Sequence, residues 1–569
     1  KISYSGSLGT NQGIKMPEMM TAYQQGTALN DMWQQEITYM GKDPSGYSMF
    51  SENELNKMKS MDYNWLEQGW HNSMNTRHTL NVSGGSETVR YFIGGSYMFA
   101  NGNFSNLSVN RYGIRFGVDA QITKNLKGTF SMDYSQKDSE MPLNSIDTEY
   151  DRMYGTFSEL ARTSRFIPAY INGLPVNTTG GVHALEMFNS GSYRRNNSND
   201  VATGMSLEYT IPQVKGLKVS VSGNYSRTSE YGKQLSKPYY LYGFYADTDY
   251  PHFLSETQLP ITDSKYKTKV NNGDKIYESA NFAYAYQLNP QISYSNKFGN
   301  HDVSGMLMYE QSQGGGNGLA ESRQNVTIPN YEIMDGYSQT GMTTKSNINT
   351  LTRRQSFIGR FSYSYADRYF VESAARYEAS TRFAPGYRWG LFPSISLGWR
   401  VSEEEFFKDN ITFMTNLKLR ASAGRLGEDK VAANQWQSSY VTNGSTLIGG
   451  GVLSTNLKPQ NGGLVYYIST WEKSDTYNAG IDMQFFNELT FNIDGFYKHT
   501  TDIINTPQSE FPQSAGITGT IPKLNYGIQD AWGGEAEIAY NKKINKDLLF
   551  TVKGHFAYAM NKVLKKYQN

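Results

Sequence analysis

Strict alternation of apolar and polar residues, repeated along the whole chain, is the feature that most constrains its fold. In GLFPSISLGWR, residues 390–400, the apolar residues Leu391, Pro393, Ile395, Leu397 and Trp399 stand at odd positions, and the even positions from 394 onward hold Ser394, Ser396, Gly398 and Arg400. Successive side chains of a β-strand point to opposite faces of the sheet, so a period of two residues predicts a strand with one apolar face.

Seventeen segments show this alternation. A run of about 8–12 residues suits a tilted strand that crosses a membrane. Five of the segments lie before residue 140, and the others lie near 202–212, 216–228, 286–298, 302–312, 355–366, 368–379, 390–402, 414–424, 475–486, 488–499, 530–541 and 547–560. The chain is therefore predicted to be all-β, an antiparallel transmembrane β-barrel.

The connections between these segments alternate in length. Short turns such as SGGSET (83–88) alternate with long segments near 11–75, 137–201, 229–285, 313–354, 425–474 and 500–529. Short turns at one rim and long loops at the other are typical of an outer-membrane barrel whose short rim is periplasmic. The long segments are therefore expected to be extracellular.

Three details of the connections carry further expectations. Residues 17–70 are predicted to form a helical insertion at the rim of the barrel. The turn SEEEFFKDN (402–410) is longer than the other turns on its side. QGGGNG (313–318) lacks the lysine of a phosphate-binding loop and is interpreted as a flexible loop tip.

The composition agrees with a barrel and excludes other classes. Only 38% of the 569 residues are hydrophobic, yet 14% are aromatic, and aromatic residues form girdles at both membrane boundaries of such barrels. No stretch approaches the roughly 18 apolar residues of a membrane helix. The net charge of +1 gives no electrostatic case for nucleic-acid binding, and the lack of cysteine excludes disulfides and thiolate metal sites.

Longer motifs carry a family resemblance. DYNWLEQGWHNSMNTRHTLNVSGGSETVRYFIGGSYMFANGNFSN (62–106) resembles the first barrel hairpins of SusC-like (SusC/RagA) TonB-dependent outer-membrane transporters of Bacteroidetes. LFPSISLGWRVSEEEFFKD (391–409), followed by NLKLRASAGRLGED (416–429), is similar to the mid-barrel motif of that family. The segments 471–504 and 526–541 match its later strands in order, so the resemblance covers essentially the whole chain.

The resemblance implies a plugged barrel of the 22-stranded kind. An odd number of strands does not close a bacterial single-chain barrel. Residues 1–569 are therefore expected to be a partial barrel, with about five more strands after Asn569. The plug, the TonB box and the N-terminal carboxypeptidase-like domain of the family are not in this sequence, and energised import is expected only of an intact protein that contains them.

Arginines recur on the polar face of four successive predicted strands. They are Arg360, Arg376, Arg400 and Arg420, with Glu372 and Glu378 nearby. Charges inside a barrel need partners, and a plug domain offers them. These residues are expected to face the lumen and the plug, and a direct role in substrate passage is the alternative.

Two aromatic groups in predicted loops are candidate ligand sites. The segment 239–253 contains seven aromatic residues, and it contributes Tyr242, Tyr245, Asp247 and Asp249. A second group contributes Trp389, Trp436 and Trp471. Aromatic faces can stack on sugar rings, and carboxylates accept hydrogen bonds from sugar hydroxyls. Loop packing, or contact with a partner protein, is the alternative for both groups.

No catalytic pattern is apparent. The seven histidines are dispersed and lack metal-ligand spacing. The sequence therefore predicts no catalytic residue, no metal site and no cofactor. A hydrolase would need a Ser/His or acid/His constellation at the loop rim, and the sequence suggests none.

By resemblance, the chain is the barrel of an outer-membrane, TonB-dependent importer of oligosaccharides. A SusD-like surface lipoprotein is expected to close over the long loops, and TonB is expected to act through the plug. An oligopeptide importer of the same family is the nearest alternative. A non-transporting barrel, such as an adhesin or a hydrolase, and a passive porin are alternatives from other classes.

Overall fold

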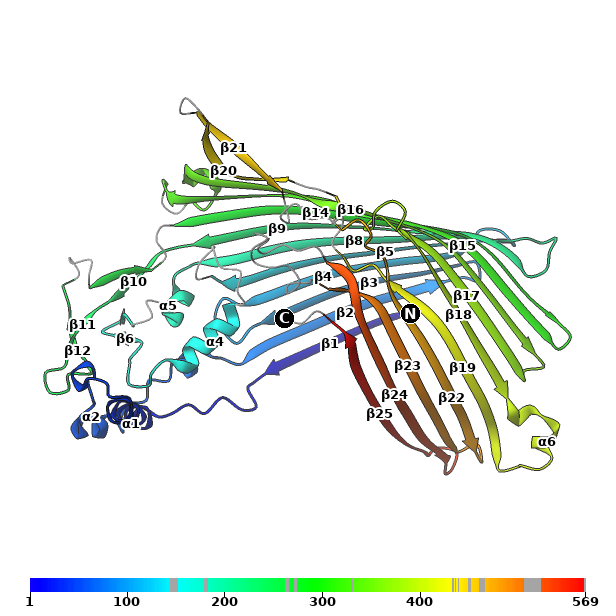
Figure 1. The fold of residues 1–569 in the computed structure, drawn as a ribbon, viewed down its shortest axis with the longest axis horizontal. Helices are drawn as coiled ribbons and strands as arrows, with labels where there is room; N and C mark the ends of the chain where they lie inside the picture. The colour runs from blue at the N-terminus through cyan, green and yellow to red at the C-terminus, as the bar shows by residue number, and fades with distance from the viewer. Residues whose placement is uncertain are drawn as a thin grey trace.

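The computed structural model describes residues 1–143, 152–178, 183–260, 266–270, 274–328, 331–431, 434, 436–437, 440–448, 452–459, 466–505 and 523–566. Seventeen strands form one antiparallel sheet, in which each strand pairs with the next in chain order (Figure 1). They are β1 (Ile2–Asn11), β2 (Ser73–Gly85), β3 (Val89–Asn101), β4 (Ser108–Gln121), β5 (Leu126–Pro142), β8 (Tyr193–Thr210), β9 (Leu217–Ser236), β14 (Lys275–Phe298), β15 (His301–Val326), β16 (Tyr337–Tyr365), β17 (Tyr369–Ser380), β18 (Trp389–Arg400), β19 (Met414–Glu428), β22 (Glu472–Phe485), β23 (Leu489–Asn505), β24 (Leu524–Lys543) and β25 (Leu549–Lys565). The predicted all-β fold is confirmed.

The register separates the sheet into an apolar and a polar face. One row of directly opposed residues runs Tyr369, Trp399, Leu419, Ile481, Ile493, Ala536, Phe556 across seven strands. The adjacent row, one position along each strand, runs Phe370, Gly398, Arg420, Gly480, Asp494, Glu535, Ala557. Opposed residues share a face, and neighbours along a strand lie on opposite faces. The alternation seen in the sequence is thus continuous from strand to strand.

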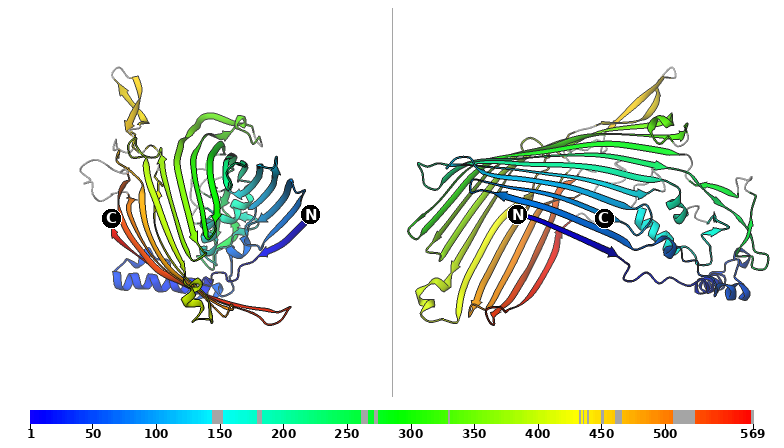
Figure 2. Two further views of the ribbon diagram at one scale, coloured as in Figure 1. Left: turned by 90° about the vertical axis from the view of Figure 1, so that its right-hand side faces the viewer. Right: turned by 180° about the vertical axis from the view of Figure 1, so that it is seen from behind.

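The sheet is strongly curved. Figure 2 shows it curling into an open trough with β1 at one edge and β25 at the other. Within the described part of the chain, each of these two strands pairs on one side only, β1 with β2 and β25 with β24. The large apolar side chains of the apolar face are exposed, among them Leu391 (56%) and Leu397 (52%).

Long and short connections lie at opposite ends of the sheet (Figure 1). The long ones contain α1 (Ala22–Met40), η1 (Pro44–Gly46), α2 (Glu52–Met58), α3 (Trp65–Gly69), α4 (Arg152–Arg162), β6 (Tyr170–Ile171), β7 (Leu174–Pro175), α5 (Ala184–Asn189), β10 (Tyr239–Tyr242), β11 (Phe244–Ala246), β12 (Leu254–Gln258), β13 (Lys267–Val270), η2 (Met334–Gly336), β20 (Tyr440–Ile448) and β21 (Val452–Pro459). The lengthened turn at the short end contains η3 (Val401–Glu403) and α6 (Glu405–Lys408).

The long connections pack into small cores of their own. Helix α1 begins at a capping box, in which the Thr21 hydroxyl accepts from the Gln24 N–H and the Gln24 side chain accepts from the Thr21 N–H. One core joins α1 and α2 to Phe253, and another joins α3, α4 and α5 around Trp65 and Leu160. None of the described helices combines the length and apolar character needed to cross a membrane.

Several strands extend beyond the predicted limits. Strands β14, β15 and β16 contain 24, 26 and 29 residues, well past the apolar alternation that marked them in the sequence. The interpretation of QGGGNG as a flexible loop tip is wrong, because Gly314, Gly315 and Gly316 lie in β15, opposite Ala285, Tyr284 and Ala283. Backbone pairing continues where lipid contact ends, so the side-chain pattern no longer reports it.

Candidate functional site

Three of the four predicted arginines of the polar face pair with carboxylates of the same sheet. Arg420 on β19 donates to Asp482 (2.9 Å) and Asp494 (2.8 Å) on β22 and β23. Arg360 donates to Glu372 (2.7 Å) on β17. Arg376 contacts Glu378 on its own strand and Glu310 on β15. The sequence placed Glu372 and Glu378 near these arginines but did not reveal Glu310, Asp482 or Asp494; the barrel wall itself supplies the partners.

Arg400 is different. Its guanidinium lies 5.7 Å from the centre of the Phe370 ring, and Lys418, directly opposite Arg400 on β19, lies 4.7 Å from the same ring. Among the described residues neither cation has an ion-pair partner, and the buried Nε of Arg400 has no hydrogen-bond acceptor. The polar face therefore has two cations without a direct ion pair close to the lengthened turn, although the charge of Arg400 helps to lower the pKa of Glu403 and Asp482 is opposite Lys418. The plug-facing role of the four arginines stays a prediction.

A buried carboxylate, which the sequence did not single out, joins three strands near the long-connection end. Asp429, just after β19, is 2% exposed. Arg354 on β16 donates to it at 3.1 Å, and the Ser380 hydroxyl at the end of β17 donates at 2.7 Å. Arg382 lies 3.7 Å away. A buried charge is tolerated when it is paired and hydrogen-bonded, so Asp429 anchors the chain that leaves β19.

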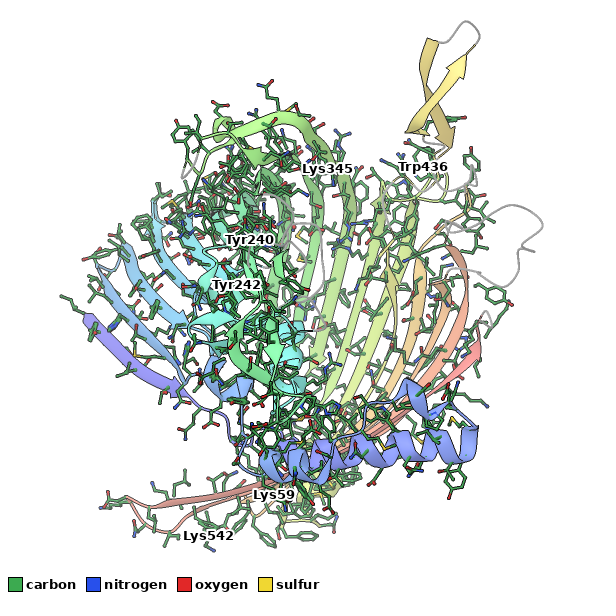
Figure 3. All side chains as sticks on the ribbon, turned by 90° about the vertical axis from the view of Figure 1, so that its left-hand side faces the viewer. Lys59, Tyr240, Tyr242, Lys345, Trp436 and Lys542 are labelled. Atoms are coloured by element: carbon green, nitrogen blue, oxygen red, sulfur yellow. The ribbon has the colours of Figure 1, made fainter. Side chains whose placement is uncertain are left out.

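The aromatic segment 239–253 folds as parts of two small hairpins. Tyr242 lies in β10, and Tyr245 lies in β11 and is 46% exposed. Figure 3, a view from the long-connection end, shows Tyr240 and Tyr242 between the N-terminal strands (blue) and the C-terminal strands (orange to red) of the curved sheet. Asp247 is engaged elsewhere, because it forms an ion pair with Lys57 of α2 at 3.2 Å and accepts the backbone N–H of Asp249 at 2.9 Å.

The second aromatic group gathers around Arg388, but its members do not form an open loop surface. Trp389 lies in β18 and stacks on Tyr377, with ring centres 4.5 Å apart, in line with Leu391 on the apolar face. Trp471 is 3% exposed and donates its indole N–H to the Arg388 carbonyl at 2.8 Å, which leaves it no surface for a ligand. Trp436 is partly buried, with the Arg388 guanidinium 6.0 Å from its ring. The expectation that Trp389 is loop-borne is wrong, because its alternation partners place it in a strand.

The long connections do bring a serine, a histidine and an acid together, against the sequence-based expectation. The Ser48 hydroxyl lies 2.7 Å from Nε2 of His252, and Nδ1 of His252 lies 2.7 Å from Glu54. Ser48 and His252 are 204 positions apart, so no local motif marks the contact. Glu54 also accepts the backbone N–H of Ser51 and caps α2. These bonds hold the 250–253 turn against α2.

Buried titratable groups in the same region serve packing. His183 is fully buried, accepts the Glu186 N–H at Nδ1 (3.0 Å) and lies 2.8 Å from the Ala169 carbonyl at Nε2. Burial lowers the pKa of His183, which favours the neutral ring that these two bonds require. Among the described residues, no group of three or more His, Asp or Glu side chains is arranged to hold a metal ion.

The fold defines a class of protein. A family model described as "TonB dependent receptor-like, beta-barrel" matches residues 149–569, and the chain belongs to this family. Its members are outer-membrane proteins, and the chain is therefore a part of an outer-membrane barrel.

The chain is similar to individual transporters of this family. The chain is 24% identical to the TonB-dependent receptor SusC of Bacteroides thetaiotaomicron, over 99% of this chain and 53% of the relative. It is 25% identical to the TonB-dependent receptor P3 of Formosa agariphila, over 91% of this chain and 48% of the relative. The structure of the RagAB peptide transporter superposes with a TM-score of 0.76 at 16% identity, over 100% of this chain and 61% of that one. The SusC/RagA resemblance is confirmed, and the chain spans about half the length of these curated relatives.

Proposed function

We propose that the intact protein is a TonB-dependent importer of the bacterial outer membrane and that this chain supplies seventeen strands of its barrel. The observation that carries the proposal is the pair of adjacent rows across β17–β25: one is apolar and largely exposed, and the other holds the charged residues Arg420, Asp494 and Glu535 with mostly small residues between them. The apolar face meets lipid and the polar face lines the lumen. Such a division suits a wall between a bilayer and an aqueous or protein-filled interior.

The proposed cargo is an oligosaccharide, captured under a SusD-like lipoprotein that covers the long-connection end. The exposed aromatic side chains there, such as Tyr240 and Tyr245, support a sugar ligand. An oligopeptide is the second candidate, because the RagAB relative is described as a peptide transporter. The plug is expected to dock against the polar face, with acidic side chains opposite Arg400 and Lys418.

Uptake in cells tests the import proposal. The gene is deleted and complemented with either the intact protein or a variant that lacks the TonB box, and growth is followed on defined oligosaccharides and oligopeptides. Growth that requires both the protein and its TonB box is expected. Equal growth with and without the TonB box would contradict energised import. If the deletion impairs growth on oligopeptides but not on oligosaccharides, the cargo is a peptide.

Co-purification tests the lid. An affinity tag on the intact protein, solubilised from outer membranes in mild detergent, should recover one stoichiometric surface lipoprotein. Isolation of the barrel alone, in a detergent that keeps a known transporter–lipoprotein pair together, would count against the lid.

We further infer that the chain is not an enzyme, although Ser48, His252 and Glu54 are close together. Glu54 and His252 are both committed to holding the 250–253 turn against α2. A fluorophosphonate probe, which labels activated serines, should therefore leave Ser48 unmodified. Labelling that disappears in Ser48→Ala would favour the hydrolase alternative.

A further inference from the structure

A cavity of 1110 Å³ opens on the polar face, toward the long-connection end of the strands β5, β8, β9, β14, β15 and β16. Two adjacent rows of opposed residues form its floor: Asn196, Gly232, Ser279, Ala320 and Lys345, and Arg194, Gln234, Tyr277, Ser322 and Thr343. Figure 3, which faces this end, shows Lys345 near the upper end of the green strands. The cavity is separate from the aromatic segment and from the ion pairs of β17–β23.

The walls of the cavity have an excess of positive charge. Lys137 and Lys345 line it, and neither makes an ion pair with a described residue. Arg194 donates to Gln234 at 3.3 Å, but its buried Nε has no acceptor among the described residues. Other cations of the lining are neutralised, for example Arg195 by Glu140 at 3.1 Å and Lys233 by Glu278 at 3.3 Å.

The acidic contribution to the lining is small. Glu230 is the acidic residue of the lining, and Asn196 donates to it. The three cations Lys137, Arg194 and Lys345 therefore outnumber the single carboxylate that faces the same space. A buried guanidinium N–H without an acceptor and a cavity that collects cations both favour an anionic ligand.

The uncharged part of the lining suits a ligand with many hydroxyl groups. Ser139, Ser279, Ser322 and Thr343 supply hydroxyls, and Gln234 and Gln324 supply amides, each able to donate and to accept. Gly232 keeps the floor open, because a Cβ there would stand 2.7 Å from the Ser279 hydroxyl oxygen. Tyr277 adds an aromatic face on the same floor.

We propose that this cavity binds an acidic oligosaccharide, with uronate carboxylates or sulfate esters paired to Lys137, Arg194 and Lys345. The planar guanidinium of Arg194 suits a carboxylate or a sulfate, and the hydroxyl and amide side chains suit the neutral positions of the sugar. The inference rests on the proposed import function and names the substrate class of that barrel.

Binding to the full-length protein in detergent tests the charge requirement. Calorimetric titration compares hexagalacturonate, neutral maltohexaose and hexaglutamate. Hexagalacturonate is expected to bind, more weakly as salt increases, and maltohexaose to bind at least about tenfold more weakly. Equal affinity for maltohexaose would overturn the charge requirement, and preference for hexaglutamate would overturn the sugar in favour of an acidic peptide.

Variants then test the cavity. Arg194→Gln and Lys345→Gln should each weaken hexagalacturonate binding about tenfold. Lys127→Gln, at the opposite end of β5, is the matched control and should bind normally. Retention of the heat-dependent shift on SDS gels verifies that each barrel is folded. Normal binding by both cavity variants would overturn the site.

The two proposals fail in different ways. If hexagalacturonate binds to the purified protein but cells show no TonB-dependent uptake, the import proposal is overturned and the proposal of a binding cavity stands. If cells take up an acidic oligosaccharide in a TonB-dependent way, and neither Arg194→Gln nor Lys345→Gln affects the uptake, the proposed binding cavity is overturned and the import proposal stands.

Discussion

Glu54 shows how one side chain can hold a surface segment in place. It is 2% exposed and accepts hydrogen bonds from the Ser51 backbone and from the backbone and ring of His252. Burial alone would raise the pKa of Glu54, but these hydrogen bonds outweigh it and lower the pKa to about 2. The charged form is therefore the one that the folded connection needs.

This carboxylate predicts an acid-dependent release of α2. Because the folded pKa of about 2 lies below the ordinary value of 4.5, the stabilisation is complete above pH 4.5 and is lost as the pH falls toward 2. It amounts to roughly 3 kcal/mol of local stability at neutral pH. A Lys59→Cys variant, labelled with an environment-sensitive dye at the exposed end of α2, should report the release between these pH values.

Glu54→Gln is the companion variant. The amide of glutamine carries no negative charge, so its hydrogen bonds to Ser51 and His252 are weaker and α2 should be loosened at pH 7. The dye signal of this variant should no longer depend on pH below 4.5. A pH profile identical to that of the parent would show that another group controls the transition.

Strands carry the membrane contact, and β18 allows the two faces to be compared directly. Ile395 is 48% exposed on the apolar face, and Ser396, the next residue, is opposite Glu372 on the polar face. Ile395→Arg should destabilise the barrel by roughly 2–4 kcal/mol, because it places a charge in lipid. Ser396→Arg should cost far less, since the new side chain stays on the polar face and no charge enters the lipid.

Urea unfolding of the intact barrel in lipid vesicles measures this difference. Equal losses in the two variants would mean that both faces meet the same environment, which would contradict the assignment of lipid and lumen.

At the scale of the whole molecule, the number of strands decides how the sheet can close. In a meander of seventeen antiparallel strands, β1 and β25 run in the same direction, so they cannot pair with each other in an antiparallel ladder. An odd number of further strands between them restores antiparallel pairing throughout. We propose that the intact barrel has 22 strands, and five further strands would satisfy this condition.

The two edges predict the behaviour of residues 1–569 when they are produced alone. Unpaired edge strands recruit other chains, so the chain should form oligomers or aggregates in detergent. Light scattering after size-exclusion chromatography measures this, with the intact protein as the control. A stable monomer with the mass of one chain would contradict the expectation that further strands are required.

The sequence alone determined the order of the strands and, within the alternating segments, the face that each residue occupies, because the side chains of a strand alternate between its two faces and those faces meet different solvents. It did not determine where β14, β15 and β16 end, because the alternation stops before the backbone pairing does. It also placed the long and short connections, since a meander alternates its ends. It could not determine which side chains meet. Arg376 reaches Glu310 across an intervening strand, Trp389 stacks on Tyr377, and Ser48 meets His252 from 204 positions away. Curvature of the sheet and packing of the connections decide these contacts, so only the tertiary structure revealed them.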